Sequence, residues 1–93
     1  MAERITMWIE SLEVADGRAA VRGQVWLGPV REGAVFTAAT TAGDEQPVQL
    51  RVEEIEAPAA AQEPGRVPRV FATLAGDGVD RLEAGVVLVG EIA

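Results

Sequence analysis

The chain has 93 residues, of which 48% are hydrophobic and 4% aromatic, and its formal net charge is −7. This length suits one domain with a single modest core, and the scarcity of aromatic residues makes that core aliphatic. The absence of cysteine and histidine excludes disulfides and thiolate zinc sites, and it removes the commonest metal ligand and general base.

Apolar and polar residues alternate at the N-terminus, which indicates a β-strand rather than a helix. Ile5, Met7 and Ile9 share one face, and the alternation slips by one residue before Leu12 resumes that face. A β-bulge near Glu10 explains the slip, because a bulge adds one residue to a strand. The first ten residues contain charges and no long apolar run, so we expect neither a signal peptide nor a membrane span, and a cytoplasmic protein.

The dipeptide Asp16-Gly17 predicts the turn of a β-hairpin that leads into a second strand over residues 21–27. We expect the apolar residues of this strand to face inward, because they alternate with polar residues and a tryptophan. In the expected register Val14 lies opposite Val21. The bulge near Glu10 shifts the pairing by one residue for the part of the first strand that precedes it.

The two tryptophans fall on the outer face of this hairpin. The expected register places Trp8 opposite Trp26, and it places Glu13 opposite Arg22 as an opposite-charge pair. Either the two rings only stack on each other, or they form the anchor of a partner-binding site, because tryptophan is enriched in such anchors. In the second interpretation Glu10 and Glu13, on the same strand, favour a protein partner with a basic rim.

Four further strands, short turns and one longer segment complete the chain. Residues 57–68 contain three prolines and predict a flexible surface loop, and residues 79–83 predict a single helical turn. The strands predicted after the hairpin are 34–40, 48–55, 69–75 and 86–92. Six strands with short turns favour a single all-β domain over residues 1–93 that closes into an antiparallel barrel, because closure removes unpaired edges.

The predicted core consists of the apolar residues that share the inner face of these strands. Small barrels are filled by such side chains, which leaves recognition to the outer face. The residues expected inside are Ile5, Met7, Ile9, Leu12, Val14, Val21, Val25, Leu27, Phe36, Leu50, Val52, Val70, Leu74 and Leu88.

Two runs of glycines and apolar residues are spaced as in a known family. The first is Gly23-x-Val25-x-x-Gly28-x-Val30-x-x-Gly33, and the second is Leu74-x-Gly76 followed by Asp80 and Gly85-Val86-Val87-Leu88. In this order the two runs cover nearly the whole chain, which resembles domain 2 of the translational GTPases, the family of elongation factor Tu. The resemblance implies a six-stranded closed antiparallel β-barrel of the elongation factor Tu domain 2 type.

In that family the barrel helps to hold aminoacyl-tRNA or contacts the ribosome. The resemblance therefore implies an alternative function as a translation-related RNA or ribosome binder, through Arg22, Arg66 and Arg69. The matching segments differ, since 52–56 is acidic here and 65–71 has a proline and a phenylalanine where relatives carry an acidic residue and a glycine. This difference and the negative net charge make nucleic acid the weaker expectation.

No residue pattern in the chain is typical of catalysis. Ser11 and the threonines have neither a histidine nor a lysine to activate them, and the chain lacks the lysine of a nucleotide-binding loop. We therefore expect no catalytic residue, no nucleotide, no cofactor and no metal. The predicted function is that of a non-catalytic binding module, a stand-alone barrel that acts through protein-protein contacts, and a hydrolase is a remote alternative.

Overall fold

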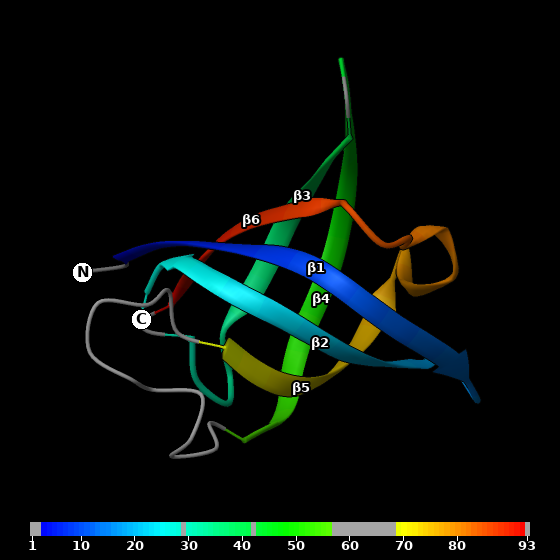
Figure 1. Ribbon diagram of the computed structural model, residues 1–93, viewed down its shortest axis with the longest axis horizontal. Coiled ribbons are helices and arrows are strands. Elements are labelled where there is room, and N and C mark those ends of the chain that lie inside the picture. The colour runs from blue at the N-terminus through cyan, green and yellow to red at the C-terminus, as the bar shows by residue number, and fades with distance from the viewer. Residues whose placement is uncertain (1–2, 29, 42, 57–68, 93) are drawn as a thin grey trace.

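The computed structural model describes residues 3–28, 30–41, 43–56 and 69–92 (Figure 1). Six antiparallel strands form a closed barrel in the order β1-β2-β5-β4-β3-β6. The prediction of an all-β domain with a closed six-stranded antiparallel barrel is confirmed. The loop predicted at 57–68 lies outside the described residues.

All six predicted strands are present, and β2 and β4 begin three and four residues earlier than predicted. The six strands are β1 (Glu3–Ala15), β2 (Arg18–Leu27), β3 (Val35–Thr41), β4 (Asp44–Glu56), β5 (Arg69–Asp77) and β6 (Val87–Ile92). The predicted helical turn is present as one 3-10 turn, η2 (Val79–Arg81). Neighbours in the barrel are not all neighbours in sequence, because β5 lies between β2 and β4, and β6 lies between β1 and β3.

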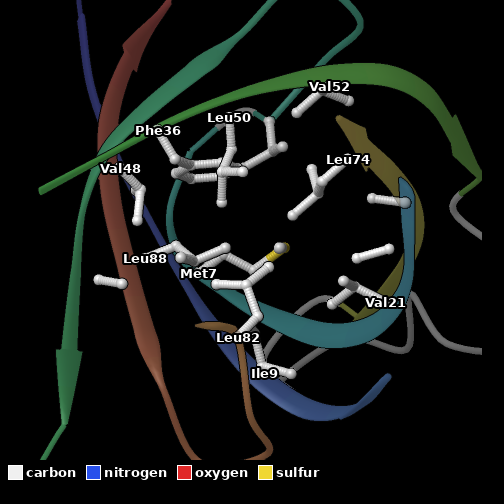
Figure 2. Packing of buried hydrophobic residues seen from close by; sticks show 14 of the residues in the cluster. Met7, Ile9, Val21, Phe36, Val48, Leu50, Val52, Leu74, Leu82 and Leu88 are labelled. Carbon is white, nitrogen blue, oxygen red and sulfur yellow. The ribbon is translucent and has the colours of Figure 1, made fainter. Parts of the chain in front are cut away.

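One aliphatic core fills the barrel interior. Figure 2 shows Met7, Leu74 and Leu88 pointing into the same space as Phe36. Of the predicted core, Leu12 and Val25 are partly buried against this cluster, whereas Val14 and Leu27 are exposed. The other predicted core residues are all buried, namely Ile5, Met7, Ile9, Val21, Phe36, Leu50, Val52, Val70, Leu74 and Leu88.

The prediction was wrong for Val14 and Leu27, for two different reasons. Val14 is 45% exposed because the pairing of β1 with β6 ends at Trp8, so no strand covers that side of the hairpin tip. Leu27 is 48% exposed because the register of β1 and β2 shifts at Trp26, which places Leu27 opposite the outward-facing Thr6.

The register of the β1–β2 hairpin also differs from the predicted one. Asp16 and Gly17 form a two-residue turn with φ angles of 53° and 74°, as a type I′ turn requires. Ala15 therefore pairs with Arg18. Residues of β1 consequently lie opposite β2 residues that come two positions earlier in the sequence than expected. The bulge is confirmed, because the register shifts between Ile9 and Ser11.

This register corrects two predicted pairs. Trp8 lies opposite Gln24 rather than Trp26, and Glu13 lies opposite Ala20 rather than Arg22. The predicted ion pair between Glu13 and Arg22 is therefore wrong. The tryptophans are diagonal neighbours, a separation that aromatic side chains still bridge.

Candidate functional site

Trp8 and Trp26 contact each other on the outer face of the barrel. Their ring centroids are 6.5 Å apart and the ring planes differ by 8°, so the indoles are stacked. The Trp26 Nε1 atom donates a long, exposed hydrogen bond of 3.4 Å to the Oε1 atom of the Gln24 side chain. Trp8 is half-buried and Trp26 is 54% exposed.

Apolar side chains on neighbouring strands extend this pair into a surface. Trp8 lies opposite Val87 of β6, and Val89 lies opposite Thr6, so both valines share the outer face with Trp8. Leu27 is exposed on the other side of Thr6. We call Trp8, Trp26, Leu27, Val87 and Val89 the tryptophan surface. Trp26 and Leu27 are exposed, and the other three side chains are half-buried. Apolar side chains that cluster on a surface in this way are typical of interaction sites.

Gly23 allows the two strands that carry the tryptophans to approach closely. Gly23 lies opposite Ile9, next to the bulge of β1. A Cβ atom on Gly23 would lie 2.5 Å from the carbonyl oxygen of Trp8 and 3.3 Å from the Cγ atom of Met7. Such a contact with backbone is not relieved by a change of rotamer, so any larger residue would displace β1 and with it Trp8.

A second feature is a groove of about 540 Å³ that crosses four adjacent strands. Three consecutive residues of each strand line it, and they form three rows across the sheet. The middle row points inward, and the two flanking rows point outward. The rows are Leu12–Val21–Ala72–Ile55 in the middle, with Ser11–Arg22–Phe71–Glu56 and Glu13–Ala20–Thr73–Glu54 on either side.

The groove lies on the outside of the barrel. Its lining includes both outward-facing rows and none of the inward-facing residues that follow along the strands, such as Ile9 and Leu74. Val21 and Ala72 are buried in the core, so they contribute mainly backbone to the groove. The groove is therefore a surface site rather than an internal cavity.

Carboxylates and one aromatic contact set the chemistry of the groove. Glu13 lies at its β1 side, and Glu54 and Glu56 lie at its β4 side. Between them the Arg22 guanidinium lies over the Phe71 ring, 4.9 Å from its centroid. The ion pairs found between described residues are Arg18–Glu53 and Arg81–Asp77, so none involves a carboxylate of the groove.

The structure distributes the predicted site residues over both features. Glu10 follows Trp8 on β1 at the bulge, and its Oε2 atom is buried without a hydrogen-bond partner among the described residues. Glu13 and Arg22 belong to the groove rather than to the tryptophan surface. Arg69 lies opposite Gln24 in the β2–β5 pairing, and Arg66 lies outside the described residues.

Three residues of the groove were not predicted as site residues from the sequence, namely Phe71, Glu54 and Glu56. Glu54 and Glu56 flank Ile55, and this alternation is the one local signal that they share a face. Their proximity to Arg22 depends on the position of β5 between β2 and β4, which no local pattern contains.

Within the described ranges, no group of three or more acidic side chains is arranged to hold a metal ion. No helix in the described part of the chain is long and apolar enough to cross a membrane. No protein-family model matches the chain, and neither a curated protein nor a solved structure shows significant similarity to it.

Proposed function

We propose that this protein is a non-catalytic binding module that engages a partner protein through the tryptophan surface. The observation that carries the proposal is the stacked Trp8–Trp26 pair with Leu27 exposed beside it. A stacked pair alone is explained by the packing of the two rings against each other. The exposed Leu27 beside it enlarges the apolar surface in contact with water, which packing between the rings does not explain. Partner binding would remove this area from water, which is the main driving force of association.

The proposal includes a relationship to the barrel of elongation factor Tu domain 2. Two observations support it: the two glycine-valine runs have the spacing of that family, and the chain closes into a six-stranded antiparallel barrel. Gly23 belongs to the first run, and a Cβ atom at this position would clash with the Trp8 carbonyl oxygen of β1, so the structure requires glycine at one position of the run.

RNA or ribosome binding is the second candidate function. The contact between Arg22 and Phe71 favours it, because arginine and an aromatic ring together suit phosphate contact and base stacking. Glu13, Glu54 and Glu56 line the same groove and would repel phosphates. The hydrolase remains the least supported candidate, since Ser11 in this groove has no histidine or lysine to activate it.

The experiment is a selection of binders from a library of random displayed peptides, followed by fluorescence titration. The chain has two tryptophans and no tyrosine, and both tryptophans lie in the tryptophan surface, so intrinsic emission reports directly on it. We expect selected peptides to shift this emission. The Trp26→Ala variant should bind them at least about tenfold more weakly, since an anchor tryptophan contributes well over 1 kcal/mol.

Val14→Ala is the matched control, because Val14 is a comparably exposed apolar residue on the same hairpin outside the surface. This variant should bind the selected peptides normally. Peptides that bind wild-type and Trp26→Ala protein equally would contradict the proposal. RNA binding that weakens steeply with salt and depends on Arg22 would favour the second candidate instead.

A further inference from the structure

We propose that the groove across β1, β2, β5 and β4 binds a basic, extended segment of the same partner that occupies the tryptophan surface. The inference rests on the proposed function and specifies the chemistry of the partner. It assigns the apolar part of the partner to the tryptophan surface and its lysines or arginines to Glu13, Glu54 and Glu56.

The two sites lie next to each other along the β1–β2 hairpin. Trp8 and Ser11 are three residues apart on β1, and Trp26 and Arg22 are four residues apart on β2. At about 3.3 Å per residue, roughly 10 to 13 Å separates the tryptophan surface from the near edge of the groove. One peptide chain of three or four extended residues spans this distance, so both sites are within reach of a single segment.

The carboxylates determine which occupant fits the groove. Glu13 lies on β1 and Glu54 and Glu56 lie on β4, with β2 and β5 between them. Neighbouring strands are about 4.8 Å apart, so the two groups of carboxylates are separated by roughly 14 Å along the sheet. A peptide that follows the curved outer face of the barrel covers that length in about four residues. Two basic side chains four positions apart would therefore reach both groups.

The middle of the groove suits the residues between those basic side chains. Ala20 and Thr73 have small side chains, so the groove is open at their positions. Phe71 lies beside them and is 39% exposed. Arg22 lies over Phe71 and forms no ion pair with any described carboxylate. The groove therefore presents an aromatic platform between carboxylates that lack a cationic partner within the described residues.

Charge complementarity distinguishes this occupant from the others. A second copy of the chain would bring another net charge of −7 to an acidic groove, so self-association is disfavoured. A nucleic acid would place phosphates beside Glu13, Glu54 and Glu56, which outnumber the single arginine of the groove. A basic peptide is attracted by both the local and the total charge.

The test uses a labelled synthetic peptide of about ten residues with a leucine- and proline-rich half and two arginines four positions apart. A second peptide has glutamine in place of both arginines. By fluorescence anisotropy at low salt, wild-type protein should bind the arginine peptide at least about tenfold more tightly than the glutamine peptide. In the triple variant Glu13→Gln, Glu54→Gln, Glu56→Gln this preference should fall to about twofold or less.

A variant with the same change of net charge at other exposed positions is the control, namely Glu32→Gln, Glu45→Gln, Glu83→Gln. These glutamates do not line the groove, so the control should keep most of the preference for arginine. Equal preference in the two triple variants would overturn the inference, because only total charge would then matter. Wild-type protein that binds the arginine and glutamine peptides equally tightly would also overturn the inference.

Failure of the inference and failure of the proposed function are distinguishable. If the glutamine peptide still shifts tryptophan emission and loses affinity in Trp26→Ala, the tryptophan surface binds peptides and only the assignment of the groove is wrong. If both peptides bind Trp26→Ala as tightly as wild-type protein, the proposed function fails. A concentration-dependent dimer that excludes the peptides would also overturn the inference.

Discussion

The two phenylalanines form a natural pair of probes for the barrel, because one is inside and the other outside. Phe36 is fully buried and is the largest side chain of the core, whereas Phe71 is on the outer face and contacts Arg22. Replacing each by alanine removes the same atoms from two different environments. The ratio of the two losses in stability therefore reports whether the strands close as described.

The expected magnitudes differ several-fold. A buried phenylalanine removes at least about 150 Å² from water, which at about 25 cal/mol per Å² corresponds to roughly 4 kcal/mol. This agrees with the range of about 3 to 5 kcal/mol for Phe→Ala changes in protein cores. Phe71→Ala should cost about 1 kcal/mol, mainly through loss of its contact with Arg22 and of partial burial.

Thermal unfolding followed by circular dichroism measures the difference. A domain of this length has a free energy of unfolding of about 5 to 14 kcal/mol, so Phe36→Ala should lose a large part of it. Its melting temperature should fall by at least about 12 °C, against less than about 8 °C for Phe71→Ala. Equal losses, or a larger loss for Phe71→Ala, would refute the placement of Phe36 in the core.

Three further changes test local features by urea denaturation. Gly23→Ala should cost about 1 to 3 kcal/mol, because its Cβ would meet the Trp8 carbonyl oxygen, and an unchanged midpoint would contradict that close approach. Gly17→Ala should cost about 1 kcal/mol through its positive φ alone, and Gly17→Asn should recover most of it; equal losses would argue against the type I′ turn. Arg18→Ala should cost less than about 1 kcal/mol, because the ion pair with Glu53 is exposed, and a larger loss would mean that the pair is structural.

The alternation of side chains was sufficient to predict all six strands and most of the core. Ile5, Met7 and Ile9 illustrate why: each is flanked by residues that tolerate water, so the period of two specifies the buried face. The slip before Leu12 was sufficient to predict the bulge at Glu10, because it breaks that period. These features are local, and local sequence contains the information for them.

The register of the hairpin was not predictable in the same way. Asp16-Gly17 suits a two-residue turn, but it is equally compatible with a longer loop. Val14 has an apolar partner in both registers, Val21 in the expected one and Ala19 in the observed one. The second register shift, at Trp26, leaves no break in the alternation before Leu27. The sequence therefore predicted that both tryptophans lie outside, but it gave the wrong partner for Trp8.

The groove depends on strand order rather than on any strand alone. Glu13, Phe71 and Glu54 come from three strands that are far apart in sequence, and they meet because β5 lies between β2 and β4. Periodicity predicts that each of these side chains points outward, but it does not predict which strands are neighbours in the barrel. A site of this kind becomes visible only when the pairing of distant strands is known.

The most direct test of the account compares peptide binding by Leu27→Arg with binding by the double variant Trp8→Ala, Trp26→Ala. Leu27→Arg keeps both tryptophans but puts a positive charge on the tryptophan surface. Loss of binding by this variant is therefore not explained by loss of the indole stack or by unfolding. By isothermal titration calorimetry with a selected peptide, the double variant should lose at least about 2 kcal/mol of binding free energy, and Leu27→Arg a comparable amount. Circular dichroism should show both variants folded. Normal binding by a folded Leu27→Arg protein would contradict the account and would mean that the tryptophans only pack against each other.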